Sequence, residues 1–299
     1  MDAAVERADM EIYRSASGRQ VIQDWCTHEL ERVLPTADLR TVATPLGPTH
    51  LTTVGVGPNV VLLPGTNFGA ATSTPLIAAL AGAFRVTTVD LPGQPGLSCG
   101  TRLQDNLVAQ HRRWLAHVLG EISGSGQPPL VIGESLGAAV ALCAEPGPHI
   151  GGLILVVPAG LVGARVDVRT LAATLPWLLR PTRPRAGRLL ATMASGAAIL
   201  DANQLTEWMT LVPEHVRSSL APAPLPNPVL SAWRNTPCQV VVGARDRIYG
   251  PHRLADPAQK LLHCSTTVVP DAGHLLTHTA PYAVAQVASK LSRLVGGAT

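Results

Sequence analysis

The stretch VIGESLGAAVAL, residues 131–142, is an apolar run interrupted by two glycines, a glutamate and a serine. It continues an aliphatic segment that begins near Pro129, which is typical of a strand buried on both faces, and the residues after Ser135 favour a helix. Gly133 and Gly137 therefore flank a tight strand-to-helix turn that would lift the Ser135 hydroxyl clear of the backbone. Two hypotheses follow: Ser135 is a small turn residue, or it is a nucleophile.

The rest of the chain alternates strand-like with helix-like segments. Continuous apolar runs, expected for parallel strands covered on both faces, lie at residues 59–65, 84–93, 129–135, 152–158, 238–246 and 265–274. Helical patterns lie between them at residues 74–82, 105–122, 135–144 and 281–295. Ahead of this region, residues 3–34 are expected to form a helix, and residues 39–44 and 50–55 a hairpin around the turn-forming PLGP. The pattern predicts an α/β fold with a mostly parallel central sheet and helices on both faces.

One interval breaks this alternation, because no strong strand pattern appears between Val157 and Cys238. Connections in α/β units usually contain only about 2 to 6 residues. The helical patterns in this interval therefore indicate an inserted helical cap over residues 162–236. The two parts of the core domain are then residues 1–161 and 237–299.

Composition excludes several classes of protein. The 299 residues are 46% hydrophobic and 14% charged, which suits a globular chain with a full core. The net charge of +3 comes almost wholly from arginine without a basic run, which argues against nucleic-acid binding. No apolar stretch approaches the roughly 20 residues of a membrane helix, and the polar N-terminus resembles neither a signal nor a transit peptide, so we expect a cytoplasmic protein. Five scattered cysteines favour reduced thiols over disulfides or a metal site.

A serine hydroxyl becomes a good nucleophile when a base takes its proton and a third group orients that base. Asp246 follows one strand pattern, in GARD, and His274 follows the next, in DAGH. Both are therefore expected with Ser135 at the carboxyl-terminal edge of the sheet, where α/β proteins gather their ligands. Asp271 and His278 are the local competitors. Asp271 lies too close to His274 in the same loop to support it, and His278 comes a helical turn later.

Five segments together resemble the α/β-hydrolase family of serine hydrolases with a helical cap, and in particular its carboxylesterase-like members. They are LLPGTN at residues 62–67, VDLPGQPGLS at residues 89–98, GESLG, GARD and DAGH, so the resemblance covers nearly all of the chain. It implies a catalytic triad of Ser135, Asp246 and His274. It also implies an oxyanion hole formed by the backbone amides of Thr66 and Leu136.

Two positions depart from the family pattern. Pro64 stands where the family usually has a histidine, and Pro95 interrupts the usual G-x-G. Three further residues are expected to contact the substrate: Asn67, next to the oxyanion loop, and Trp177 and Trp208 in the inserted helices. Tryptophans in a small helical layer also suit that layer's own core, so this alternative stays open for the last two.

The resemblance implies acyl transfer on a carboxylic ester with an apolar acyl or alcohol group, through an acyl-enzyme at Ser135 and without a metal or organic cofactor. Serine in place of aspartate argues against dehalogenases and epoxide hydrolases. A thioesterase, transacylase or cyclase could use the same triad, as could a C–C hydrolase or a cofactor-free perhydrolase. A non-catalytic binding module on this fold is a further alternative. The expected partner is a small-molecule ester or acyl compound, and the oligomeric state stays open.

Overall fold

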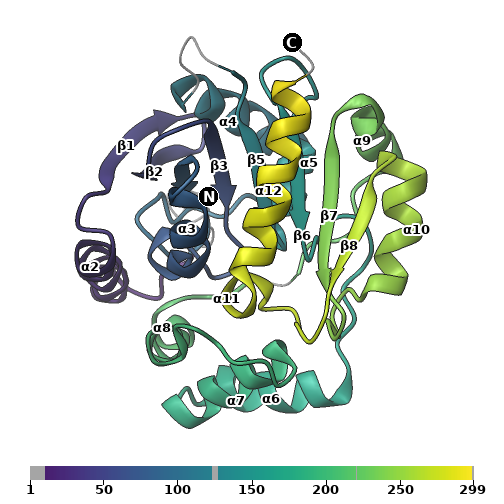
Figure 1. Cartoon of the computed structure of the whole chain (residues 1–299). Helices are drawn as coiled ribbons and strands as arrows, with labels where there is room; N and C mark the ends of the chain where they lie inside the picture. The colour runs from purple at the N-terminus through teal and green to yellow at the C-terminus, as the bar shows by residue number, and fades with distance from the viewer. Residues whose placement is uncertain (1–10, 123–126, 220, 298–299) are drawn as a thin grey trace.

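A computed structural model describes residues 11–122, 127–219 and 221–297. In these residues eight strands form one sheet in the order β1-β2-β4-β3-β5-β6-β7-β8 (Figure 1). β2 pairs antiparallel with β1 and with β4, and all other neighbouring strands are parallel. The strands are β1 (Asp38–Thr44), β2 (Gly47–Val54), β3 (Asn59–Leu63), β4 (Arg85–Val89), β5 (Leu130–Glu134), β6 (Gly152–Val156), β7 (Cys238–Gly243) and β8 (Ser265–Val269).

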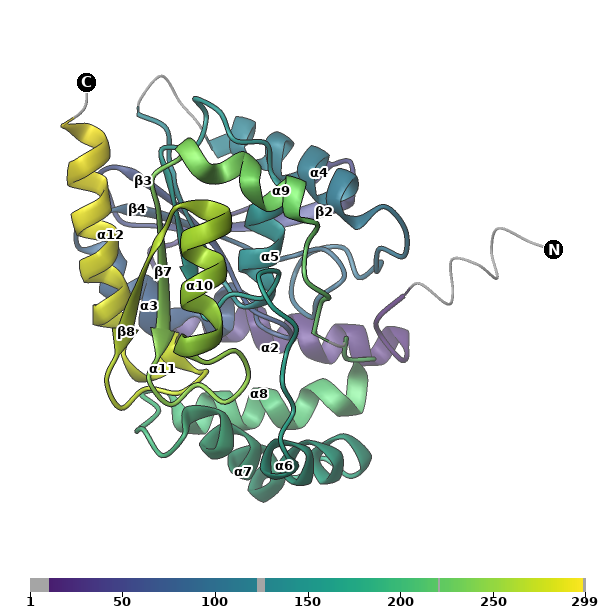
Figure 2. The same cartoon turned by 90° about the vertical axis from the view of Figure 1, so that its right-hand side faces the viewer.

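Helices cover both faces of the sheet. α3 (Thr74–Ala81) and α12 (Pro281–Gly296) lie together on one face, with α4 (Leu107–Ile122) and α5 (Leu136–Cys143) on the other (Figure 2). The other helical elements are α2 (Ala16–Val33), η1 (Ala70–Thr72), α6 (Val168–Leu179), α7 (Arg183–Ala194), α8 (Ala202–His215), α9 (Asn227–Ser231), η2 (Ala232–Asn235), α10 (Pro251–Leu262) and α11 (Leu276–Thr279). The structure confirms the predicted fold class, a mostly parallel sheet with helices on both sides.

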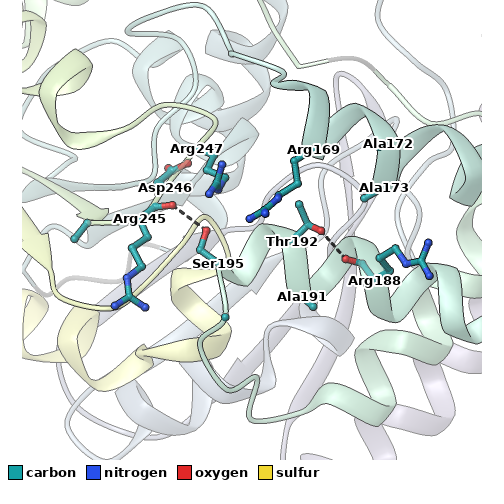
Figure 3. A pocket seen from close by; sticks show the side chains of 12 residues that line it. Arg169, Ala172, Ala173, Arg188, Ala191, Thr192, Ser195, Arg245, Asp246 and Arg247 are labelled. Atoms are coloured by element: carbon teal, nitrogen blue, oxygen red, sulfur yellow. Dashed lines mark hydrogen bonds between the residues drawn. The ribbon is translucent and has the colours of Figure 1, made fainter.

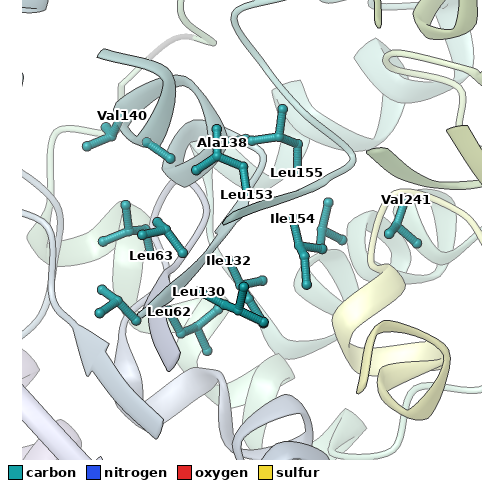
Figure 4. Close-up of a cluster of buried hydrophobic side chains, with 14 of the residues drawn as sticks. Leu62, Leu63, Leu130, Ile132, Ala138, Val140, Leu153, Ile154, Leu155 and Val241 are labelled. Atoms are coloured by element: carbon teal, nitrogen blue, oxygen red, sulfur yellow. The ribbon is translucent and has the colours of Figure 1, made fainter. Parts of the chain in front are cut away.

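The central strands are buried because their sequences are apolar on both faces. Every residue of β5 and β6 is buried, and aliphatic side chains of β3, β5, β6 and β7 pack with those of α5 (Figure 4). The six apolar runs correspond to β3 through β8. Several of these runs extend beyond the strand's end, because the chain leaves the sheet there to form the loops that carry the site residues.

The N-terminal helix is shorter than the expected span of residues 3–34. α2 begins after Ser15, whose hydroxyl accepts a hydrogen bond from a first-turn amide at 3.0 Å and so caps the helix. Residues 11–14 are extended and form bridges with the loop after β4 and with the chain just after α8. The helical prediction was wrong here because those distant hydrogen bonds leave no local pattern. Residues 3–10 lie outside the described part of the chain.

The segment between β6 and β7 has two parts. α6, α7 and α8 lie beyond the carboxyl ends of the parallel strands (Figure 1). α9 and η2 instead pack against α5 and α10, beside the sheet. Trp233 of η2 is fully buried and donates its indole N–H to the Leu142 carbonyl at 3.0 Å. This tryptophan thus belongs to the main core, and the helices above the strand ends are α6 to α8.

Gly137 provides a test of how closely α5 must approach the sheet. A Cβ at this position would lie 1.9 Å from the Leu63 carbonyl oxygen, so Gly137→Ala should lower the free energy of unfolding by about 3 kcal/mol or more. Gly187→Ala is the matched control, because a Cβ there meets nothing within 4 Å and should stabilise α7 by up to about 1 kcal/mol. Urea or thermal unfolding measures both, and equal stabilities for the two variants would contradict this packing argument.

Candidate active site

Ser135 occupies the turn between β5 and α5 with a φ of +48° and a ψ of −108°. Its amide donates to the Val156 carbonyl of β6 at 2.9 Å, which anchors this unusual backbone to the sheet. Gly133 is required because a Cβ there would lie 2.6 Å from the Ala138 Cα. On the other side, a Cβ at Gly65 would lie 3.5 Å from the Ser135 Cβ, so the loop after β3 runs directly beside the serine.

The loops after β7 and β8 bring Asp246 and His274 together. Asp246 Oδ2 lies 3.2 Å from His274 Nδ1, and Asp246 Oδ1 accepts hydrogen bonds from the amides of Ile248 at 2.8 Å and Tyr249 at 3.2 Å. The Asp246 side chain has no exposed surface. The carboxylate is therefore held rigidly against one imidazole nitrogen, and Nε2 is the nitrogen left for a proton from another group.

The charges around His274 determine its proton affinity. Burial lowers the pKa of His274, but the charge and hydrogen bond of Asp246, together with the charge of Glu134, outweigh it and hold this pKa above its ordinary value. Burial raises the pKa of Asp246, yet its partners outweigh that effect and the pKa lies below its ordinary value. Glu134 is itself buried and accepts a hydrogen bond from the Thr277 hydroxyl at 2.6 Å. Asp246 is thus suited to stabilise an imidazolium.

Tyr249 is a site residue that the sequence analysis missed. It lines the same cavity as Ser135, and its ring centroid lies 5.6 Å from that of His274. Burial and the Asp246 charge raise the pKa of Tyr249 to about 12, so its hydroxyl stays protonated at neutral pH and can donate. The only sequence signal was its position three residues after Asp246, which gains meaning once the loop folds back.

The backbone amides of Thr66 and Leu136 lie on the two sides of Ser135. Leu136 begins α5, where amides lack partners within the helix. Neither amide donates a hydrogen bond within the described part of the chain, so both are free to stabilise developing negative charge. The Asn67 amide is instead bound to the Gln94 side chain at 2.9 Å, and the Asn67 side chain to the Ser218 hydroxyl at 2.8 Å. Asn67 therefore fixes the shape of the loop after β3, which carries Thr66.

Residues 89–98, VDLPGQPGLS, hold the loop after β3 in place. The two carboxylate oxygens of Asp90 accept the amides of Ala70 at 2.7 Å and Leu97 at 2.8 Å. Pro95, which departs from the family pattern, leaves both contacts in place. Its neighbour Gln94 provides the side chain that holds the loop after β3. The segment is thus a structural support for the site.

A cavity of about 510 Å³ lies at Ser135 and His274. One wall is apolar and comes mainly from α6, α7 and α8; it includes Trp177, Leu178, Leu189, Met193 and Met209. The polar lining residues include Arg14, Thr66, Asn67, Arg217, Ser218 and Ser219, together with Thr170 and Thr174 of α6. The cavity therefore combines an apolar surface with several polar and charged groups.

The two tryptophans expected to contact substrate have different positions. Trp177 lines the cavity and donates its indole N–H to the Met209 carbonyl. Trp208 is fully buried and is not among the cavity-lining residues of the described chain. It stacks on Trp25 with ring centroids 4.7 Å apart and donates to the Asn67 carbonyl at 2.7 Å. Trp208 thus holds the Asn67 backbone in place and does not itself line the cavity.

The two competing residues lie away from this cavity. The Asp271 side chain is 78% exposed and pairs with Arg245. His278 is buried, but its Nδ1 lies 3.1 Å from Asp201 Oδ1, which joins α11 to the start of α8. Asp246 and His274 are therefore the acid and base that the structure brings to the cavity of Ser135.

A second hollow of about 850 Å³ lies between α6, α7 and the loop after β7 (Figure 3). The arginines that line it are Arg169, Arg188, Arg245 and Arg247. All four are exposed, and two of them form salt bridges, Arg245 with Asp271 and Arg247 with Asp167. Asp246 borders this hollow, but its carboxylate faces the imidazole. The hollow is a solvated cationic surface without a nucleophile and base of its own.

Within residues 11–122, 127–219 and 221–297, no group of three or more His, Cys, Asp or Glu side chains is arranged to hold a metal ion. All five cysteines are free thiols. In the same part of the chain, no helix has both the length and the apolar character needed to cross a membrane.

The strand order, the turn at Ser135 and the loops after β7 and β8 define a hydrolase of the α/β class. The chain belongs to the alpha/beta hydrolase family, whose sequence model matches residues 60–287. No curated protein sequence matches the chain.

Solved structures with low sequence identity share the fold. They include carboxylesterase CesB of Bacillus subtilis, with 18% identity, a TM-score of 0.75 and coverage of 93% of this chain and 99% of that one. Naproxen esterase of Bacillus subtilis has 18% identity, a TM-score of 0.76 and coverage of 92% and 98%. The 2-hydroxy-6-oxo-6-phenylhexa-2,4-dienoate hydrolase of Rhodococcus sp. strain RHA1 has 20% identity, a TM-score of 0.66 and coverage of 86% and 100%.

Glu134→Gln should shift the pH dependence of hydrolysis. His274 must be neutral to accept a proton, so kcat/KM should fall as the pH drops through the raised pKa of His274, with a midpoint above about 6.5. Glutamine keeps the oxygen that Thr277 contacts but removes a negative charge, which lowers the pKa of His274 and moves the midpoint to lower pH. Profiles of kcat/KM against pH measure this shift. Asp271→Asn, at an exposed carboxylate, is the control and should leave the midpoint in place.

Proposed function

We propose that this chain is a serine esterase that hydrolyses a carboxylic ester with an apolar acyl or alcohol group through an acyl-enzyme at Ser135. One observation carries the proposal: His274, held by Asp246 at 3.2 Å, shares a cavity with Ser135, whose positive-φ turn exposes the hydroxyl. The family assignment supports hydrolysis. The apolar cavity wall supports an apolar group on one side of the ester.

In the acylation step, the ester carbonyl lies against Ser135 Oγ, with its oxygen toward the amides of Thr66 and Leu136. Oγ bonds to the carbonyl carbon as His274 Nε2 takes the serine proton, and Asp246 stabilises the resulting imidazolium. The two amides stabilise the oxyanion, an effect worth about 3 kcal/mol per donor in comparable sites. His274 then returns the proton to the leaving alcohol oxygen as the C–O bond breaks.

In the deacylation step, water replaces the alcohol. The water oxygen attacks the acyl carbon while His274 takes a proton from the water. The bond between the acyl carbon and Ser135 Oγ then breaks. Tyr249 lines the same cavity as Ser135, and its hydroxyl, which is protonated at neutral pH, is available there to donate to Oγ as negative charge develops on it. His274 finally returns the proton to Oγ, and the carboxylic acid leaves.

The inserted segment, residues 162–236, acts in this proposal as a cap whose helices α6 to α8 form the roof of the cavity. Trp177 contributes directly to its apolar wall, whereas Trp208 acts through Asn67. Each methylene of substrate buried there would contribute about 0.8 kcal/mol to binding. Chain-length preference is therefore set mainly by the Trp177 side of the cavity.

Ser135→Ala tests the nucleophile. Alanine fits the same turn but lacks Oγ, so folding should be retained while turnover of p-nitrophenyl esters falls by more than about 10⁴-fold. Covalent labelling by a fluorophosphonate should disappear in the same variant. Circular dichroism verifies the fold. A folded variant that keeps its labelling would show that another residue is the nucleophile.

Asp246→Asn tests the acid that orients the base. An amide at this position favours the wrong tautomer of His274, so kcat should fall by about 10³ to 10⁴-fold. Asp271→Asn removes a carboxylate from the same pair of loops, but that group is exposed, and kcat should change by less than about threefold. Steady-state kinetics of the two variants show which of the two carboxylates kcat depends on. The reverse ranking would transfer the role to Asp271.

A further inference from the structure

Two arginines line the catalytic cavity, and a third contacts one of them. Arg14 belongs to the extended N-terminal segment and Arg217 follows α8, and both line the cavity. The Arg14 amide donates to the His215 carbonyl at 2.8 Å and the Arg217 amide to the Ile12 carbonyl at 2.7 Å, so the two segments run side by side. Arg102, from the loop after β4, donates to the Arg217 carbonyl. Three distant parts of the chain thus bring positive charge to one place.

None of these guanidinium groups has a carboxylate partner among the described residues. Arg217 donates to two backbone carbonyls, the nearer being that of Glu11 at 3.0 Å. Arg102 Nε is buried without a hydrogen-bond acceptor. The Arg14 side chain makes no ion pair or hydrogen bond within the described chain. The neighbouring carboxylate, that of Glu11, is already engaged by Arg19.

Like charges held this closely repel one another. The pKa of Arg102 is lowered by its burial and by the charge of Arg217, which reflects that repulsion. In the hollow of Figure 3, two of the four lining arginines, Arg245 and Arg247, each have an aspartate partner, and Ser135 and His274 are not among its lining residues. Unneutralised guanidinium groups that line a catalytic cavity are suited to bind an anion.

The part of the cavity that Arg14 and Arg217 line, called here the arginine end, lies beside the loop after β3. Ser218 follows Arg217 and hydrogen-bonds to the Asn67 side chain at 2.8 Å, whereas the apolar wall comes from α6, α7 and α8. Glu134 is the one carboxylate among the described lining residues, and its contact with α11 turns it away from this end. A molecule with its ester at Ser135 can therefore place one group against the apolar wall and another toward the arginines.

We propose that the substrate carries an anionic group, a carboxylate or a phosphate, that binds Arg14 and Arg217 while its ester carbonyl lies at Ser135. The proposal rests on the proposed esterase function and specifies the class of ester. A guanidinium binds either oxyanion through paired N–H donors. Arg102, behind Arg217, adds to the positive potential at this end.

The first arm of the test uses charged and neutral esters of matched length. The p-nitrophenyl monoesters of glutaric and suberic acid are compared with the p-nitrophenyl esters of pentanoic and octanoic acid. At low ionic strength kcat/KM should favour a charged ester by about 10-fold, and added salt should reduce this preference. Arg14→Ala should abolish the preference, whereas Arg169→Ala, in the separate arginine cleft, should retain it.

The second arm asks whether the anion is a phosphate. S-acetylphosphopantetheine is compared with S-acetylpantetheine in the same proteins, with the thiol product measured. A preference for the charged member in the first arm alone identifies a carboxylate, and one in the second arm alone identifies a phosphate. Arg217→Gln is a second variant, and thermal unfolding verifies its fold because Arg217 also holds the N-terminal segment. Arg14→Ala removes no hydrogen bond or ion pair of the guanidinium among the described residues, and it keeps the test valid if Arg217→Gln is unstable.

Two results overturn the inference. One is equal kcat/KM for charged and neutral substrates in both arms. The other is a preference that persists undiminished in Arg14→Ala and in folded Arg217→Gln. Failure of the proposed function differs from both, because Ser135→Ala would then still hydrolyse the neutral esters. The two proposals are therefore tested separately.

Discussion

The backbone turn at Ser135 is the constraint on which the rest of the site depends. A non-glycine residue with positive φ costs about 1 to 3 kcal/mol and persists only where its surroundings hold it. Here the amide of Ser135 is bound to β6 at 2.9 Å, and α5 is pressed against the sheet through Gly133 and Gly137. Relaxing the turn would separate α5 from the strands beneath it. Ser135 is therefore held rigidly because the main core is well packed.

Strand pairing determines the position of Asp246 and His274 relative to that turn. β7 and β8 are parallel neighbours with Gly243 opposite Val269. Asp246 and His274 follow these two positions by only a few residues, so their loops leave the sheet side by side. The 3.2 Å contact between the two side chains is thus a consequence of register. A slip in the pairing of β8 would remove the base from the acid that orients it.

Much of the fold and of the candidate site was predictable because the signals are local. A strand buried on both faces is a continuous apolar run, and the turn at Ser135 needs glycines at fixed spacing. The missing parts depend on contacts between distant segments. The extended segment at residues 11–14 is held by chain far away in the sequence. Tyr249 reaches the cavity of Ser135 because its loop packs against His274, and Trp208 donates a hydrogen bond to the Asn67 carbonyl from α8. No local periodicity records such contacts.

Hydrogen bonds between distant segments also offset the repulsion between the arginines near the cavity. Repulsion between Arg102 and Arg217 opposes the packing of the N-terminal segment between the loop after β4 and the end of α8. Backbone hydrogen bonds on both sides of the segment offset it, and so does the Tyr13 hydroxyl, which donates to the Gly96 carbonyl at 3.0 Å. An anion bound between Arg14 and Arg217 would remove part of the repulsion. Arg14 belongs to the N-terminal segment and Arg217 to the chain just after α8. An anion that contacts both would therefore also strengthen the contact between these two segments.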